Sequence, residues 1–161
     1  MEKYKFLEHT ADMKFQAFGK TIEEAFENSA YALIEIMCKE KIKDALITKI
    51  KVSGKDYESL LYNFLEEFLF LLGSENFILN KINRISKIRI DKNGDYELVA
   101  DISGDNAKNY IFDLDVKAVT YNEMFVKSPD SKLNKKFKAL KTNSFSSHEK
   151  KKWIVQVVVD V

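Results

Sequence analysis

Cysteine, proline and glycine are scarce in this chain of 161 residues, which has one, one and five of them respectively. The single cysteine, Cys38, excludes an internal disulfide and any metal centre built from several thiolates. We therefore expect a reducing environment, which for this composition means the cytoplasm. The five glycines do not form the spaced loop that cradles nucleotide phosphates, so a nucleotide-binding motif of that kind is excluded.

Long hydrophobic runs are also missing. No apolar segment approaches the roughly 20 residues that a membrane-spanning helix requires. The N-terminal "MEKYKFLEH" lacks the basic and apolar regions of a signal peptide. Apolar residues make up 45% of the chain and charged residues 32%, which is typical of a soluble globular protein. The length predicts one domain, residues 1–161.

Charge is nearly balanced overall, at +1, but it is unevenly distributed. Residues 128–152 contain eight lysines against Asp130 and Glu149, so the rest of the chain is acidic. An acidic body argues against a dedicated RNA-binding surface on the folded part. The 128–152 segment has weak periodicity, which predicts a basic, mobile loop; a short helix around 133–140 is the alternative. His148 lies in this segment, and we expect its side chain to be solvated.

Two helices are predicted from apolar spacing and capping residues. Thr21 and Glu24 form the pattern of a capping box, and apolar residues at helical spacing extend the helix from about 22 to 38. Asp56 can cap a second helix, which Gly73 would end in a left-handed conformation. The apolar face of this second helix contains Tyr57, Leu60, Leu61, Phe64, Leu65, Phe68 and Leu72.

Alternating segments predict strands that these helices cover. "KNGD" is a strong hairpin signal between two such segments. The predicted strands are "MKFQAF", "LITKIKVSG", "SKIRID", "YELVAD", "IFDLDVKAVTYNEMFV" and "WIVQVVVDV". The expected fold class is therefore α+β, with two helices packed on one face of a mostly antiparallel β-sheet.

Motifs for covalent catalysis are absent from the sequence. There is no nucleophile elbow and no HExxH motif, and the only histidines are His9 and His148. Neither a Ser–His nor a Cys–His arrangement is indicated. Cys38 stands at the end of an apolar helical stripe and is expected to be a small core residue.

Acidic groups near the two ends of the chain suggest a metal site. Asp12 begins one predicted strand, Asp160 ends another, and Val161 brings a terminal carboxylate. If those two strands are neighbours, these oxygen ligands converge, and they would suit Ca²⁺ or Mg²⁺. The alternative is that both aspartates are solvated residues at strand ends.

His9 and Lys117 each leave alternatives open. His9 could be a ligand, could orient Asp12, or could be an ordinary hydrogen-bonded histidine. Lys117 shares a predicted strand face with Asp113 and Asp115, which is typical of a surface ion-pair ladder of little energetic value.

Four segments together resemble the archease family. They are "FLEHTADMKFQAFGKTIEEAFENSAYAL", "LLYNFLEEFLFLL", "DVKAVTYNEMFV" and the terminal "WIVQVVVDV". They occur in the family's order and cover most of the chain outside residues 128–152. The combination of "HTAD", "VKAVTY" and a terminal "DV" is specific to that family.

The resemblance implies a function that composition does not. It implies a cytoplasmic protein cofactor of the RtcB-type tRNA-splicing RNA ligase, which promotes guanylylation of the ligase histidine and multiple turnover. Such a protein is not itself an enzyme, meets tRNA only through the ligase and has no membrane association. The resemblance also implies a metal site for Ca²⁺, or Mg²⁺, at Asp12, Asp160 and Val161, and a functional role for Lys117. Glu8 and His9 are expected beside this site or in contact with the partner.

Two departures from the family pattern stand out. Asn122 follows "VTY", where the family often has histidine, and "NAKNYIFDLDV" lacks a second histidine that is common there. If either histidine contributes to the site, this chain must do without it. Two other functions compete with the ligase cofactor: a general chaperone or protein-interaction module without a metal role, and a metal-dependent hydrolase that uses the same acids.

Overall fold

The computed structural model describes residues 2–130 and 152–161. Its elements, in chain order, are β1 (Tyr4–Leu7), β2 (Met13–Gly19), α1 (Ile22–Met37), β3 (Leu46–Gly54), α2 (Tyr57–Glu75), β4 (Phe77–Ile85), β5 (Arg89–Ile90), β6 (Tyr96–Asn106), a 3₁₀ turn η1 (Ala107–Asn109), β7 (Ala118–Lys127) and β8 (Trp153–Asp160).

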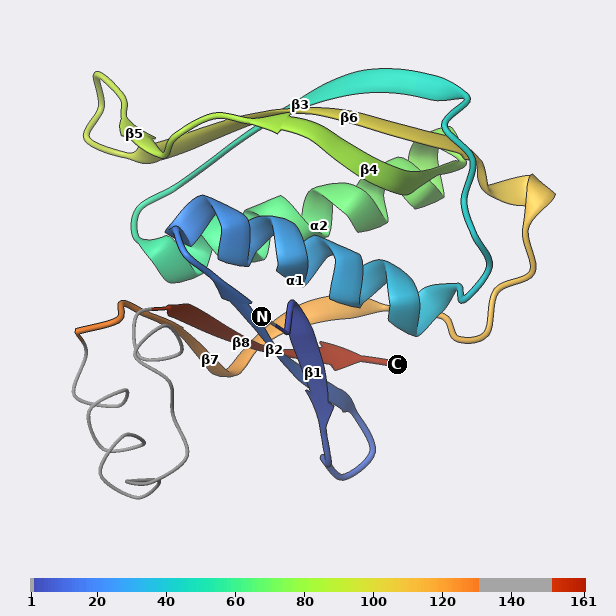
Figure 1. The fold of residues 1–161 in the computed structure, drawn as a ribbon, viewed down its shortest axis with the longest axis horizontal. Helices are drawn as coiled ribbons and strands as arrows, with labels where there is room; N and C mark the ends of the chain where they lie inside the picture. The colour runs from blue at the N-terminus through green and yellow to red at the C-terminus, as the bar shows by residue number, and fades with distance from the viewer. Residues whose placement is uncertain (1, 131–151) are drawn as a thin grey trace.

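The strands form two antiparallel sheets with both helices between them (Figure 1). One sheet has the order β1-β2-β8-β7, and the other has the order β3-β6-β4, with β5 pairing to β6. Each helix contacts strands of both sheets. The predicted α+β class and antiparallel pairing are confirmed, but the strands divide between two sheets where one was expected. Helix α1 buries consecutive residues, such as Ala32, Leu33 and Ile34, on more than one side. One sheet can cover only one side of a helix, so a second sheet covers the other.

Helix α1 begins and ends close to its predicted limits. The Thr21 hydroxyl oxygen accepts a hydrogen bond from the Glu24 amide at 3.1 Å and caps the first turn. The buried Asn28 side chain donates to the Phe18 carbonyl at 2.7 Å, which ties the helix to β2. Cys38 caps the C-terminal end and is only 3% exposed, which confirms that it is a core residue.

Helix α2 begins as predicted but ends later. The Asp56 carboxylate accepts from the Ser59 amide at 2.7 Å and caps the first turn. The prediction that Gly73 ends the helix in a left-handed conformation is wrong, because the helix continues to Glu75. The left-handed residue is Asn76, with φ 54° and ψ 32°. Asparagine tolerates this conformation better than most residues with a side chain, so it can take the place of the expected glycine.

Replacing Gly73 tests this helix end directly. A Cβ built at Gly73 meets nothing within 4 Å, so alanine fits there without a clash. Because Gly73 lies inside the helix, Gly73→Ala is expected to raise the free energy of unfolding by about 0.5–1 kcal/mol. Urea denaturation followed by Trp153 fluorescence measures this change. A lower stability would instead indicate a left-handed residue at position 73.

The predicted hairpin is present, and its outer strand is short. Gly94 has φ +83°, and its amide donates to the Asp91 carbonyl at 3.1 Å. Of the predicted "SKIRID" strand, only β5 pairs with β6. Strand β4, which was not predicted, occupies the rest of that edge of β6.

The segment before β7 corrects the predicted long strand over 111–126, because only its second half is a strand. Residues 111–117 lie outside the strands, and residues 111–113 instead bind the end of α1 and the residues that follow it. The Asp113 amide donates to the Met37 carbonyl at 2.8 Å, and the Asp113 carboxylate accepts from the Lys39 amide at 3.0 Å. These bonds take the place of strand-to-strand hydrogen bonds, so the predicted strand face shared by Asp113, Asp115 and Lys117 does not form.

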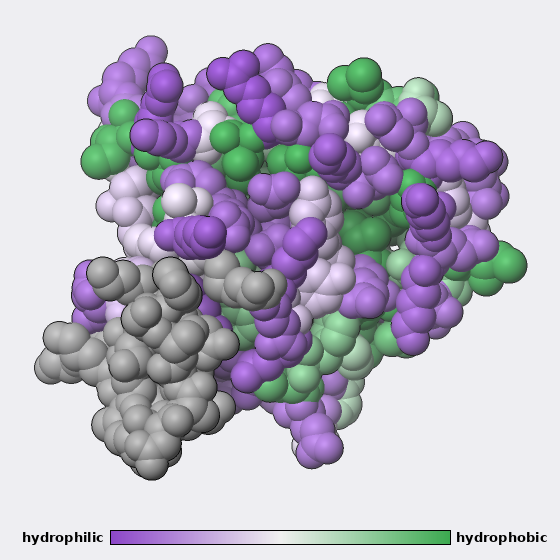
Figure 2. All heavy atoms as spheres, viewed as in Figure 1, coloured by the Kyte–Doolittle hydropathy of each residue, from purple (hydrophilic) through white to green (hydrophobic). Residues whose placement is uncertain are grey.

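Residues 131–151 lie outside the described residues, and so do most of the predicted basic loop, its alternative helix and His148. In the described part of the chain, no helix is long and apolar enough to cross a membrane. The face seen in Figure 2 is covered largely by hydrophilic side chains, with smaller hydrophobic areas between them.

Candidate functional site

The turn between β1 and β2 and the C-terminal end of β8 meet at one rim of the β1-β2-β8-β7 sheet. Met13 pairs with Val159, so continuing the register by one residue places Asp12 opposite Asp160. On the other side of β8, Ala118 pairs with Asp160, and the Lys117 amide donates to the Asp160 carbonyl at 2.8 Å. The rim therefore brings together the backbone positions of Asp12, Asp160 and Lys117.

The expected site residues differ in how far they are exposed. The Asp12 side chain is 32% exposed, while Asp160 and Lys117 are exposed and Val161 is half-buried. Glu8 is exposed too, and an open hollow is lined by Glu8, His9 and Thr10. Carboxylates and an amine at this rim are thus accessible to a dissolved ion or to another molecule.

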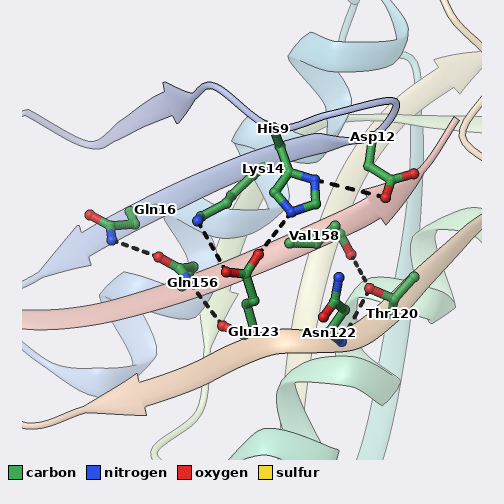
Figure 3. A network of polar contacts seen from close by, with 9 residues as sticks. All are labelled: His9, Asp12, Lys14, Gln16, Thr120, Asn122, Glu123, Gln156 and Val158. Atoms are coloured by element: carbon green, nitrogen blue, oxygen red, sulfur yellow. Dashed lines mark hydrogen bonds and ion pairs between the residues drawn. The ribbon is translucent and has the colours of Figure 1, made fainter.

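His9 lies between two carboxylates, which are in different parts of the chain (Figure 3). Its Nε2 atom is 2.8 Å from Glu123 Oε2, and its Nδ1 atom is 3.8 Å from Asp12 Oδ2. The second distance is too long for a hydrogen bond. Among the described residues, Nδ1 is the one buried side-chain nitrogen or oxygen atom without a hydrogen-bond partner. The contact with Asp12 was an open alternative in the sequence, whereas the partnership with Glu123 was not predicted.

Glu123 reaches His9 because β7 bulges. Thr120 pairs with Val158 and Phe125 with Gln156, so four residues of β7 stand against one residue of β8. The bulge explains why Val119 and Val126 are both buried although their odd separation would place them on opposite faces of a regular strand. Asn122, which follows the "VTY" segment, lies exposed in this bulge.

The charge around Glu123 favours its ionised form. The hydrogen bond with His9, and then the charge of Lys14, lower the pKa of the Glu123 carboxyl below its usual range. Lys14 Nζ lies 3.6 Å from Glu123 Oε1. Glu123 is therefore a carboxylate held by a histidine and a lysine from the β1–β2 region.

Strained backbone is concentrated at this site. Among the described residues, three non-glycine residues have positive φ, and two of them are Ala11 and Glu123, at 65° and 53°. Left-handed backbone is unfavourable for a residue with a Cβ, and such residues cluster at functional sites. Ala11 turns the chain between His9 and Asp12, and Glu123 turns β7 toward His9.

The donor atoms at the rim fit a hard divalent cation in type. Asp12 and Asp160 offer carboxylate oxygens, and the main chain of Val161 offers a further oxygen next to them. No group of three or more His, Cys, Asp or Glu side chains close enough to hold a metal occurs in residues 2–130 and 152–161. A cation here would therefore depend on main-chain oxygen, on His9 moving closer, or on ligands from elsewhere.

The chain is similar over most of its length to proteins of one family. The sequence model of the Archease protein family (MTH1598/TM1083) matches residues 4–161. Protein archease of Methanosarcina barkeri is 38% identical over 126 residues, covering 76% of this chain and 85% of that protein. Protein archease of Pyrobaculum islandicum is 33% identical and covers 98% of this chain and 95% of its own.

A solved structure has the same fold over the whole chain. The solution structure of protein 1598 of Methanobacterium thermoautotrophicum superposes with a TM-score of 0.68 at 25% identity, and the match covers 100% of both chains. The sequence match to the family thus extends across both sheets and includes the rim that holds Asp12 and Asp160. This chain belongs to the archease family.

Proposed function

We propose that this chain is a protein cofactor of an RtcB-type tRNA-splicing RNA ligase and promotes guanylylation of the ligase's active-site histidine. The observation that carries the proposal is the meeting of Asp12, Asp160 and Lys117 at one accessible rim in a member of the archease family. The chain works in the cytoplasm, meets tRNA only through the ligase and does not itself join RNA. Its relatives carry the name protein archease, which states no enzymatic reaction.

The rim would hold a divalent cation. Asp12, Asp160 and a main-chain oxygen of Val161 would be the ligands, and Ca²⁺ suits such oxygen donors, with Mg²⁺ as the alternative. When bound, the cation supplies positive charge that can neutralise phosphate oxygens during nucleotide transfer. Asp12 and Asp160 position that charge, because their strands are hydrogen-bonded neighbours.

Lys117 has a separate role in the proposal. Its main chain is anchored to Asp160, while its side chain is exposed at the same rim. An exposed ammonium on this rim can contact a phosphate group or a carboxylate of the ligase. The exposed Glu8 would take part in the same contact, by pairing with basic groups of the ligase.

The direct test compares the ligase with and without this protein. An RtcB-type ligase is incubated with labelled GTP, Mn²⁺ and a cleaved RNA substrate, and substoichiometric amounts of the chain are added. We expect faster labelling of the ligase histidine and more than one ligation per ligase molecule. Equal labelling and a single turnover in both samples would contradict the proposal. A chaperone would instead protect the ligase from heat aggregation, which light scattering measures in parallel.

A further inference from the structure

We propose that Glu123 is a positioning residue for the cation site, which turns the Nδ1 atom of His9 toward Asp12 as a further cation donor. This inference rests on the proposed cation at Asp12. It assigns a role to a residue in the β7 bulge that is distant from Asp12 in the sequence. The argument uses the network drawn in Figure 3.

The main chain of Glu123 is held in place from β8. The Gln156 side chain donates to the Glu123 carbonyl at 2.8 Å, and the Gln16 side chain donates to Gln156 Oε1 at 2.8 Å. Gln156 is buried, and both bonds are partly shielded from water. At the other side of the bulge, Thr120 donates to the Val158 carbonyl at 2.8 Å. These contacts hold the left-handed turn at Glu123 without any contribution from the Glu123 side chain.

The Glu123 side chain then determines which nitrogen of His9 carries hydrogen. An ionised carboxylate only accepts hydrogen bonds, so the 2.8 Å contact requires a hydrogen on Nε2. In the neutral ring, Nδ1 is then an acceptor with a free lone pair. That atom faces Asp12 Oδ2 at 3.8 Å, so in the neutral form of the ring two acceptors point toward each other.

A cation between these two acceptors would satisfy both. Divalent transition-metal ions bind imidazole nitrogen and carboxylate oxygen at about 2.0–2.2 Å, so two donors 3.8 Å apart can share one such ion. Nδ1 is buried and lacks a partner, which is unfavourable in the protein without an ion. Ion binding would supply the missing partner, with a small shift of the Ala11 turn.

Glu123→Gly provides the sharpest test. Glycine accepts the φ of 53° at this position without strain, so the variant removes the carboxylate while the bulge is kept. Mn²⁺ is the probe, because it accepts both nitrogen and oxygen ligands and its unpaired electrons broaden nearby NMR signals. We expect calorimetry to show Mn²⁺ affinity 10–100-fold weaker than in the wild type, the range typical for groups that orient metal ligands. Glu123→Gln retains an acceptor for Nε2–H and is expected to bind nearly as well as the wild type.

Two further measurements separate positioning from a merely structural role. Asn76→Gly makes the same kind of change at a left-handed residue at the end of α2, and it should leave Mn²⁺ affinity unchanged. The chain has only two histidines, so ¹⁵N NMR of the imidazoles should resolve His9, with hydrogen on Nε2 in the wild type and a mixture of tautomers in Glu123→Gly.

The outcomes distinguish this inference from the proposed function. If Glu123→Gly binds Mn²⁺ as tightly as the wild type while Asp12→Ala does not bind, the role of Glu123 is refuted and the cation site stands. If the wild type itself binds neither Mn²⁺ nor Ca²⁺, the cation site and this inference are both refuted, and the ligase assay still decides whether the chain is a cofactor.

Discussion

Asp12→Ala and Asp160→Ala are each expected to reduce stimulation of the ligase to the level of the ligase alone. Each substitution removes one carboxylate from the rim where β2 and β8 pair. Because the proposed site has only two aspartates and a main-chain oxygen as ligands, the loss of either carboxylate should abolish cation binding. Labelling of the ligase histidine by GTP and the number of ligations per ligase molecule measure the effect.

The same two variants should remain folded. Asp12 is partly exposed and Asp160 is exposed, and substitutions at such positions usually change the free energy of unfolding by less than about 0.5 kcal/mol. Asp44→Ala is the matched control, since Asp44 is an exposed aspartate on the connection into β3, which belongs to the other sheet. Full stimulation by both rim variants would refute the role of the acids, and so would an equal loss with Asp44→Ala.

Among the glycine positions, Gly104 is the one where an added methyl group is expected to lower the free energy of unfolding most. Gly104 lies in β6, the central strand of its sheet, opposite Leu46 on one side and Leu79 on the other. A Cβ at this position would overlap the Ile78 carbonyl oxygen, and it would lie 2.7 Å from Phe77 Cζ. Because the oxygen belongs to the main chain of β4, the strand must move. We expect a loss of about 3 kcal/mol or more.

Gly73→Ala is the control for this prediction, because the same chemical change there meets open space. The two variants should therefore shift the midpoint of urea denaturation in opposite directions. A native domain is stable by only about 5–15 kcal/mol, so Gly104→Ala removes a large share of the total and lowers the yield of folded protein. A stability equal to that of the wild type would mean that β4 and β6 lie farther apart than the structure places them.

Local signals explain why the helices could be predicted. Thr21 and Asp56 cap their helices through bonds within one turn, and such bonds depend only on residues three positions away. The hairpin at Gly94 is equally local. The error at Gly73 arose because glycine and asparagine both suit a left-handed residue, and the structure places that residue at Asn76.

The segment 111–117 could not be predicted from its pattern. Its alternation is genuine, yet the amides of Ile111 and Asp113 bond to Glu40 and Met37 at the end of α1, and only Lys117 bonds to β8. Alternation shows which side chains face a core, but it does not identify the partner of the backbone. The division into two sheets could not be predicted for the same reason, because strand pairing depends on residues far apart in the chain.

The fold class, both helices, the acidic candidates Asp12 and Asp160 and the family resemblance could be derived from the amino-acid sequence, because they depend on short-range periodicity, capping and recognisable segments. The rim shared by Asp12 and Asp160, the contact between His9 and Glu123, and the place of the helices between two sheets could be seen only in the folded chain. The reason is physical: His9 and Glu123 are separated by 114 positions, and their contact depends on a bulge whose geometry is set by pairing with β8.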